Sequence, residues 1–362
     1  MNQDLENWFF FIDKSFKKIE VRNALKLYVE KILLANSPII FEFNHLSLLL
    51  GVEREFLSKI VNKPELFYHQ FYIPKRNGEF RIINSPNTLL LEIQKWIYKN
   101  VLCPIKLHEN CIGFRKGYNI KHNASKHLNS NIILKMDLKD FFPSINKRRV
   151  IAVFRNIGYT RNISYTLASL CCKENSLPQG ASTSPYLSNI IAKRLDVRLN
   201  ALCNKFDLNY TRYADDLTIS GSFISKKFIS YISKIINDEG FIVNETKTRL
   251  LYKGNKRIIT GISISSNKLT IPKKKKREIR HIIYFIKKYG TKEHLNYRKI
   301  SDPIYLERLL GYLYFWKFVE PDNNKIESYI FTIKVELKKL SEAYAGLKEK
   351  QIEFIGKFLE KK

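Results

Sequence analysis

The stretch Tyr213-Ala214-Asp215-Asp216 decides the fold, because it places two adjacent carboxylates between two strand-forming runs. Residues 208–212 precede it and residues 217–220 follow it, so the four residues are predicted to form the tight turn of a β-hairpin. Paired acids at the tip of a hairpin can hold a metal ion. Asp is also a common turn residue, so this stretch alone leaves a purely structural role open.

A third carboxylate, Asp137, ends another apolar strand, which is predicted over residues 132–137. Carboxylate oxygens are ligands that Mg²⁺ favours. Two such ions about 3.5 to 4 Å apart activate an attacking hydroxyl and stabilise a leaving pyrophosphate in phosphoryl transfer. Asp137, Asp215 and Asp216 are therefore predicted to be catalytic and to bind two Mg²⁺ ions.

Three segments, in this order along the chain, resemble the palm motifs of reverse transcriptases: the Asp137 strand, residues Leu177-Pro178-Gln179-Gly180-Ala181-Ser182-Thr183-Ser184-Pro185, and the Tyr213 hairpin. Two shorter segments are similar to motifs of the retron reverse transcriptases. Asn123-Ala124-Ser125-Lys126-His127 resembles NAxxH, and Ile259-Thr260-Gly261 resembles VTG with Ile in place of the usual Val. The similarity extends from about Leu46 to about Ile264.

The resemblance implies an α+β protein with the fingers, palm and thumb of a right-hand polymerase. We expect an N-terminal helical region over residues 1–60 and the fingers and palm over residues 61–264. A basic helical thumb and C-terminal region would occupy residues 265–362.

The resemblance also implies two further roles near the aspartates. Leu138 would contribute only its backbone carbonyl to the metal site. Phe142 matches the position of the steric gate, where a bulky ring would collide with a ribose 2′-hydroxyl. A buried aromatic residue beside the strand is the structural alternative for Phe142.

Four positions match nucleotide-binding residues of the family. Lys75 or its neighbour Arg76, and Arg81, lie in a predicted fingers hairpin and match positions that contact the incoming triphosphate, where fixed positive charges meet phosphate oxygens. A solvated hairpin with ordinary surface basic residues is the alternative. Gln179 lies in the loop that packs on the nascent base pair. Lys247 corresponds to the candidate proton donor to the leaving pyrophosphate, and an ordinary surface lysine is the alternative there.

RNA binding is predicted at the two short motifs and at a run of lysines. The motif residues are Asn123, His127, Thr260 and Gly261, although Asn123 could simply cap a helix and Thr260-Gly261 could simply end a strand. The run Lys273-Lys274-Lys275-Lys276 opens a helix whose apolar spacing predicts that its lysines face outward. A solvated or nonspecific polyanion-binding segment is the alternative for that run.

The composition is that of a folded, basic protein. Its 362 residues include 63 Lys and Arg against 34 Asp and Glu, a formal charge of +29, and 44% are hydrophobic. A polyanionic partner is the expected reason for such charge, although charge alone would also suit a ribosomal protein, a membrane-surface protein or a nuclease. Five cysteines without paired CxxC spacing, and no signal peptide or long apolar span, predict a reduced, cytoplasmic protein with no membrane partner.

The predicted function is RNA-directed DNA synthesis from deoxynucleoside triphosphates. The resemblance implies that one structured noncoding RNA supplies template and primer, and that synthesis starts at a 2′-hydroxyl and gives a branched RNA–DNA product. It also implies a role in antiphage defence beside an effector protein. The alternatives are an inactive RNA-binding scaffold with a polymerase fold, and a bacterial reverse transcriptase of another lineage, such as an abortive-infection or group II intron-like enzyme.

Overall fold

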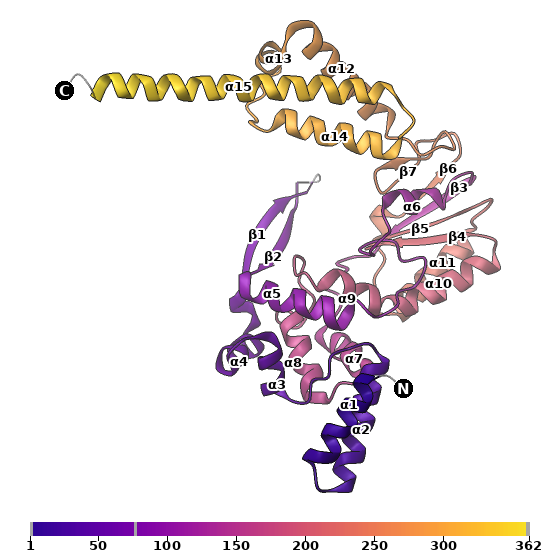
Figure 1. Cartoon of the computed structure of the whole chain (residues 1–362). Helices are drawn as coiled ribbons and strands as arrows, with labels where there is room; N and C mark the ends of the chain where they lie inside the picture. The colour runs from indigo at the N-terminus through magenta and orange to yellow at the C-terminus, as the bar shows by residue number, and fades with distance from the viewer. Residues whose placement is uncertain (1–2, 76–77, 360–362) are drawn as a thin grey trace. The chain divides into compact units, whose positions relative to one another are not determined.

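The structure is a computed structural model that describes residues 3–75 and 78–359, with side chains described up to residue 342. It combines α-helices with antiparallel strands, as the α+β prediction requires. The chain divides into two compact units (Figure 1). Unit 1 comprises residues 1–119 and 130–251, and unit 2 comprises residues 120–129 and 252–362. The expected three-part organisation, with boundaries after residues 60 and 264, stays a prediction.

Four helices open unit 1, as predicted: α1 (Gln3–Ser15), α2 (Ile19–Leu34), α3 (Phe43–Leu50) and α4 (Arg54–Asn62). Gly51 ends α3 in the left-handed conformation (φ +63°), and its N–H bonds to the Leu48 carbonyl. A residue without a Cβ is suited to this stop.

A two-stranded hairpin follows, formed by β1 (Tyr68–Pro74) and β2 (Phe80–Pro86) with Tyr72 opposite Ile82. A 3₁₀ turn (Pro64–Phe67) leads into it, and Arg76 and Asn77 of the predicted turn lie outside the described residues. The predicted amphipathic helix over residues 89–102 is α5 (Thr88–Ile97), which continues as one π-helical turn (Tyr98–Leu102).

A four-stranded sheet carries the three aspartates. Its strand order is β4 (Asn209–Tyr213), β5 (Asp216–Gly221), β3 (Ile132–Asp137) and β6 (Arg249–Tyr252). Nearly every residue of β3 is buried. In the same unit α10 (Lys193–Lys205) packs against β4, and α11 (Lys226–Asp238) packs against α10 (Figure 1).

The remaining helices of unit 1 are α7 (Lys147–Ile157), α8 (Arg161–Cys171) and α9 (Ser184–Ile191). Cys171 and Cys172 are buried, as expected for small core residues. The helix that begins at Ser184 breaks at Ala192 (ψ 0°), so residues 184–205 form two helices, α9 and α10, and not one. No glycine or proline marks this break.

Ser184 is the first residue of α9 and does not cap it. Thr183 is the N-cap of α9, and the Ser184 hydroxyl instead donates to the Pro178 carbonyl (2.8 Å). Pro185 occupies the first turn, as predicted.

Unit 2 is mainly helical. It contains α6 (Ile120–Ser125), the short hairpin of β7 (Ile258–Ile259) and β8 (Ile262–Ser263), α12 (Lys273–Tyr289), α13 (Thr291–Tyr297), α14 (Tyr305–Val319) and α15 (Lys325–Leu359). α14 lies along α15, and both α12 and α14 bury apolar side chains in the core of the unit (Figure 1). No helix within the described ranges is long and apolar enough to cross a membrane.

Candidate active site

The register of the sheet brings the three aspartates to one end of neighbouring strands. Asp137, the last residue of β3, lies opposite Asp216, the first residue of β5. Asp216 also lies opposite Tyr213 across the hairpin, and Ala214 and Asp215 form the turn. The Leu138 N–H donates to the Asp215 carbonyl (3.0 Å), which ties the turn to the end of β3. The three acids therefore lie at one end of neighbouring strands, and their role as metal ligands stays a prediction.

The electrostatics of the turn reflect this crowding. Burial, followed by the charges of Asp137 and Asp216, raises the pKa of Asp215 to about 6. Burial is also the main reason that the pKa of Asp216 is raised. Low-dielectric surroundings and like charges both disfavour ionised carboxylates, so a cation at this position would relieve an existing repulsion.

Lys247 forms an ion pair with the Asp137 carboxylate. Its Nζ is 2.9 Å from Oδ2 and 3.2 Å from Oδ1 of Asp137. The short turn Glu245–Lys247 carries it there, and Asn244 fixes that turn by donating its N–H to the Asp137 carbonyl (2.7 Å). The hydrogen bond to Asp137 raises the pKa of Lys247, so its side chain is protonated at neutral pH.

The three aspartates offer the hard oxygen donors that suit Mg²⁺. Among the described residues, however, no three His, Cys, Asp or Glu side chains are grouped as a ready metal site. The ammonium of Lys247 already neutralises Asp137. The chemistry of the donors and the raised pKa of Asp215 fit a divalent cation, and Lys247 is the positive charge it would replace.

Phe142 is half-buried in a group of aromatic rings beside the turn. Its ring centroid lies 6.2 Å from that of Phe114, which in turn lies 6.3 Å from the ring of Tyr213. Phe114 is 42% exposed and has a positive φ of 58°. Sequence reasoning missed Phe114, because a single aromatic residue in a loop follows no periodic pattern.

Both predicted triphosphate contacts lie on the β1–β2 hairpin and are exposed. Lys75 forms an ion pair with Glu79 (3.0 Å), and both side chains are well exposed. Such surface pairs contribute little free energy, so Lys75 stays available to a phosphate. Arg81 lies opposite Ile73 in the hairpin register.

The loop that contains Gln179 is fastened to the same hairpin. The Asn84 N–H of β2 donates to the Gln179 carbonyl (2.8 Å). A Cβ at position 180 would lie 2.5 Å from the Asn84 carbonyl oxygen, so Gly180 is needed for this close approach. The contact of Gln179 with a nascent base pair stays a prediction.

The two short motifs meet within unit 2. Asn123 on α6 donates its side-chain N–H to the Thr260 hydroxyl (3.4 Å), and Thr260 and Gly261 form the β7–β8 turn with positive φ values of 44° and 87°. Asn123 and His127 are buried, with exposed fractions of 1% and 0%. The Asn123 side chain therefore supports the turn from inside the protein, and Gly261 in that turn is exposed.

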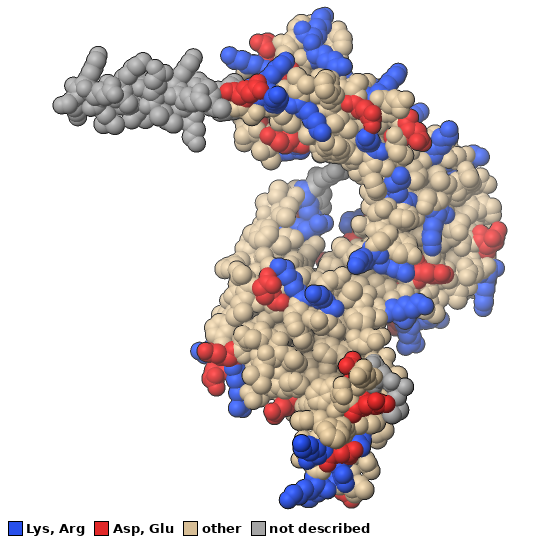
Figure 2. Space-filling model, in the orientation of Figure 1, with Lys and Arg blue, Asp and Glu red and all other residues tan. Residues whose placement is uncertain are grey.

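The four lysines that open α12 differ from one another. Lys273 and Lys274 are exposed. The Lys275 ammonium lies 3.8 Å from the ring centroid of Tyr312. The expectation that all four face outward is wrong for Lys276, which is only 19% exposed and forms an ion pair with Glu320 (2.7 Å). Basic side chains are spread over both units on the face shown in Figure 2.

The aspartates at the β4–β5 turn and the end of β3, with a half-buried phenylalanine beside them, form the arrangement of a polymerase palm. Residues 73–301 match the family described as "Reverse transcriptase (RNA-dependent DNA polymerase)". The chain belongs to this family.

Curated relatives include two retron enzymes. The chain is 36% identical to the retron Ec86 reverse transcriptase of Escherichia coli, over 69% of this chain and 79% of that protein. It is 35% identical to the retron Mx162 reverse transcriptase of Myxococcus xanthus, over 55% of this chain and 47% of that protein. A telomerase structure from Candida albicans is 13% identical with a TM-score of 0.40, over 77% of this chain and 63% of that chain, a likeness too low to carry an argument.

Family membership confirms the predicted right-hand polymerase fold, the retron-type identification and the RNA-directed DNA polymerase activity. It also implies a nucleic-acid partner and dependence on a divalent cation. The roles of individual residues stay predictions.

Burial of His127 has a measurable consequence for stability. Burial is the main reason that its pKa is lowered to about 3 from an ordinary value of 6.5. Between these two pH values the unfolded chain binds a proton at His127 and the folded chain does not, so stability falls as the pH falls below 6.5. From pH 7 to pH 5, His127 should account for a loss of about 2 kcal/mol in the free energy of unfolding.

His127→Gln should remove that part of the pH dependence. The measurement is chemical denaturation of both proteins at pH 7 and pH 5. His122→Gln, on the exposed side of α6, is the matched control and should retain the wild-type pH dependence. Equal pH dependence in wild type and His127→Gln would contradict the buried, neutral state of His127.

Proposed function

We propose that this protein synthesises DNA on a structured noncoding RNA, starting from an RNA 2′-hydroxyl to give a branched RNA–DNA product (msDNA). The observation that carries the polymerase part is the register that places Asp137 opposite Asp216 beside the Asp215 turn. The contact between Asn123 and Thr260, which joins the two retron-like motifs, supports the retron-specific part. A role in antiphage defence and an effector protein partner belong to the same proposal, and the cytoplasmic location stays a prediction.

Two Mg²⁺ ions, held by the three aspartates and the Leu138 carbonyl, would supply activation of the attacking hydroxyl and charge neutralisation at the leaving pyrophosphate. Side chains of the protein would bind the nucleotide. Lys75 and Arg81 would bind the triphosphate of a deoxynucleotide, and Gln179 would pack against the new base pair.

Lys247 is proposed as the proton donor to the leaving pyrophosphate. A general acid must hold its proton at the working pH and reach the leaving group. Lys247 meets the first condition because a lysine ammonium holds its proton at neutral pH even after a cation displaces it from Asp137. Its side chain is 60% exposed and lies beside the carboxylates.

The two alternatives receive less support. An inactive scaffold would have no need for three crowded carboxylates at this turn, where burial, followed by the charges of Asp137 and Asp216, raises the pKa of Asp215. A reverse transcriptase of another lineage does not explain the joining of the two retron-like motifs within unit 2.

Asp215→Asn tests the assignment of the aspartates. DNA synthesis should fall at least about a hundredfold, because a metal ligand is lost, whereas RNA affinity should be unchanged because the basic surface is untouched. Asp137→Asn should lower DNA synthesis to a similar extent. The double variant should be little less active than either single variant, because the aspartates act as a unit. Asp140→Asn is the matched control, since Asp140 is exposed and has a positive φ that Asn tolerates.

The same variant has a readout that does not depend on activity. The folded-state pKa of Asp215, about 6, exceeds the ordinary value of 3.8, so ionising this group at pH 7 destabilises the folded protein. Without divalent cations, Asp215→Asn should therefore raise the free energy of unfolding by about 1 to 3 kcal/mol. Near-normal DNA synthesis by Asp215→Asn would refute the metal assignment.

Phe142→Val should admit ribonucleotides, because a smaller side chain leaves room for the 2′-hydroxyl. The ratio of ribonucleotide to deoxynucleotide incorporation should rise at least about tenfold. The comparison uses matched triphosphates, and Phe142→Tyr serves as the control because it keeps the ring. An unchanged ratio in a folded, active Phe142→Val protein would show that the residue only fills space.

The exposed and the ion-paired lysines of α12 should contribute differently to RNA binding. Lys273→Gln/Lys274→Gln removes up to two phosphate contacts, so every RNA should bind more weakly and the slope of log affinity against log salt should become shallower by about 1 to 2. Lys276→Gln should leave that slope nearly unchanged, since Glu320 already neutralises Lys276.

Binding of cognate and noncognate RNA is measured across a salt series for each variant. The ratio of the two affinities should stay within a few-fold in both variants, because phosphate contacts carry no base identity. A collapse of that ratio in the Lys273/Lys274 variant, with an unchanged salt slope, would instead place specificity in the lysine run.

A further inference from the structure

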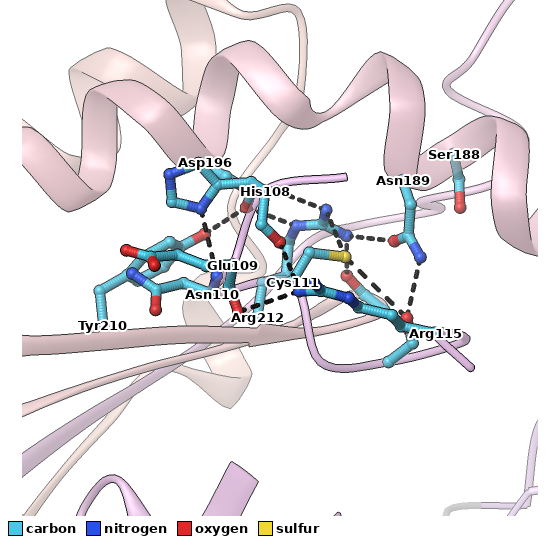
Figure 3. A network of polar contacts seen from close by, with 12 residues as sticks. His108, Glu109, Asn110, Cys111, Arg115, Ser188, Asn189, Asp196, Tyr210 and Arg212 are labelled. Atoms are coloured by element: carbon cyan, nitrogen blue, oxygen red, sulfur yellow. Dashed lines mark hydrogen bonds and ion pairs between the residues drawn. The ribbon is translucent and has the colours of Figure 1, made fainter. Parts of the chain in front are cut away.

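A fully buried ion pair lies directly behind the catalytic turn (Figure 3). Arg212 of β4 and Asp196 of α10 are both 0% exposed. The Nε and Nη2 atoms of Arg212 donate to the two carboxylate oxygens of Asp196, each at 2.7 Å. Burying two charges costs free energy that a well-packed apolar pair would not, so the pair calls for a reason beyond stability.

The rest of the guanidinium shows what that reason is. Its Nη1 atom donates to the Asn189 side-chain oxygen (2.9 Å) and to the Ala214 carbonyl (3.2 Å), and Nη2 also donates to the sulfur of Cys111 (3.2 Å). With the two bonds to Asp196, all five N–H groups of Arg212 have an acceptor. The planar guanidinium of an arginine can donate to all of these acceptors at once, whereas a lysine has only three N–H donors and cannot.

The Ala214 carbonyl is the important acceptor, because Ala214 directly precedes Asp215. Ala214 has a φ of +58°, a conformation that costs free energy in a residue other than glycine and persists only where its surroundings impose it. The guanidinium of Arg212 holds this residue through its carbonyl oxygen.

The opposite side of the turn is held by a second contact that depends on the same network. A Cβ at Gly113 would lie 2.7 Å from the Ala214 nitrogen, so the backbone of Gly113 packs directly against the turn. Asn189 donates its side-chain N–H to the Gly113 carbonyl (2.8 Å), and the Ile112 N–H donates to the Arg212 carbonyl (2.8 Å). Ala214 is thus enclosed between the guanidinium and the Gly113 backbone.

We propose that Arg212 is a positioning residue for the polymerase reaction: with Asp196 and Asn189 it fixes the Ala214 carbonyl and so aims the carboxylates of Asp215 and Asp216. This proposal rests on the proposed role of those aspartates. Four hydrogen bonds to Asp196, Asn189 and Cys111 hold the guanidinium of Arg212 rigidly, and the fifth binds the turn at the Ala214 carbonyl. Asp196 neutralises the charge of the buried guanidinium.

Arg212→Lys tests the proposal, since it keeps the charge beside Asp196 and loses the fork that reaches Ala214. DNA synthesis is measured against Mg²⁺ and deoxynucleotide concentration, together with RNA affinity and thermal unfolding. We expect kcat to fall about 10- to 100-fold, the size of effect that misplaced reacting groups produce. The Mg²⁺ concentration for half-maximal rate should rise several-fold, while RNA affinity stays within about twofold.

Tyr210→Phe is the matched control. The Tyr210 hydroxyl donates to Oδ1 of Asp196 (2.7 Å), the oxygen that also accepts from Nε of Arg212, and no hydrogen bond joins this hydroxyl to the turn among the contacts described. Its loss should lower the unfolding temperature while kcat and the Mg²⁺ midpoint stay within about twofold of wild type. If a folded Arg212→Lys protein shows the same pattern as Tyr210→Phe, the ion pair only stabilises the core and the proposal is wrong.

A second variant covers the case in which Arg212→Lys does not fold. Arg212→Met/Asp196→Leu removes both buried charges together, an exchange that other proteins tolerate. It should fold, bind RNA and show the same fall in kcat and rise in Mg²⁺ midpoint, and wild-type values of both in the folded variant would overturn the proposal. Full activity of Asp215→Asn would instead refute the aspartate assignment, so the two failures are distinguishable.

Discussion

The burial of three carboxylates close together is the constraint on which the site in unit 1 depends. Asp137 faces Asp216 across β3 and β5, and Asp215 lies in the adjoining turn. Burial, followed by the charges of Asp137 and Asp216, disfavours the ionised form of Asp215 and raises its pKa to about 6. The fold therefore holds these groups in an electrostatically unfavourable arrangement, which a bound cation would relieve.

The apolar sheet is what keeps the acids together. β3 is buried along almost its whole length, and residues of β5 such as Leu217 and Ile219 are fully buried as well. Both faces of β3 are buried, so a slip of one residue against β5 would place each side chain on the face packed for its neighbour, and core packing on both faces fixes the register. The same register sets Asp137 against Asp216. Core packing thus determines the electrostatics of the site.

The sequence predicts local structure well and long-range polar contacts poorly. The β4–β5 hairpin, the Asp137 strand and the helices of α12 and α14 follow from alternation and helical spacing, because each pattern reflects one buried face. The Arg212–Asp196 pair joins a strand to a helix, and the Lys276–Glu320 pair joins residues 44 apart in sequence, so no periodicity signals them. The break at Ala192 is invisible for a related reason, since tertiary packing and not a glycine or proline interrupts the helix.

The short retron-like motifs show that a family signature need not mark a surface that touches its ligand. Asn123 and His127 are buried, and burial keeps His127 neutral, so neither side chain offers charge or exposed donors to an RNA. Asn123 instead donates a hydrogen bond to Thr260, which adopts a positive φ in the β7–β8 turn. A turn of this kind presents its backbone and the exposed Gly261 to solvent in one fixed shape. If RNA is recognised at this hairpin, recognition would depend on the shape of that turn, and the phosphate-binding lysines of α12 would add affinity without adding sequence preference.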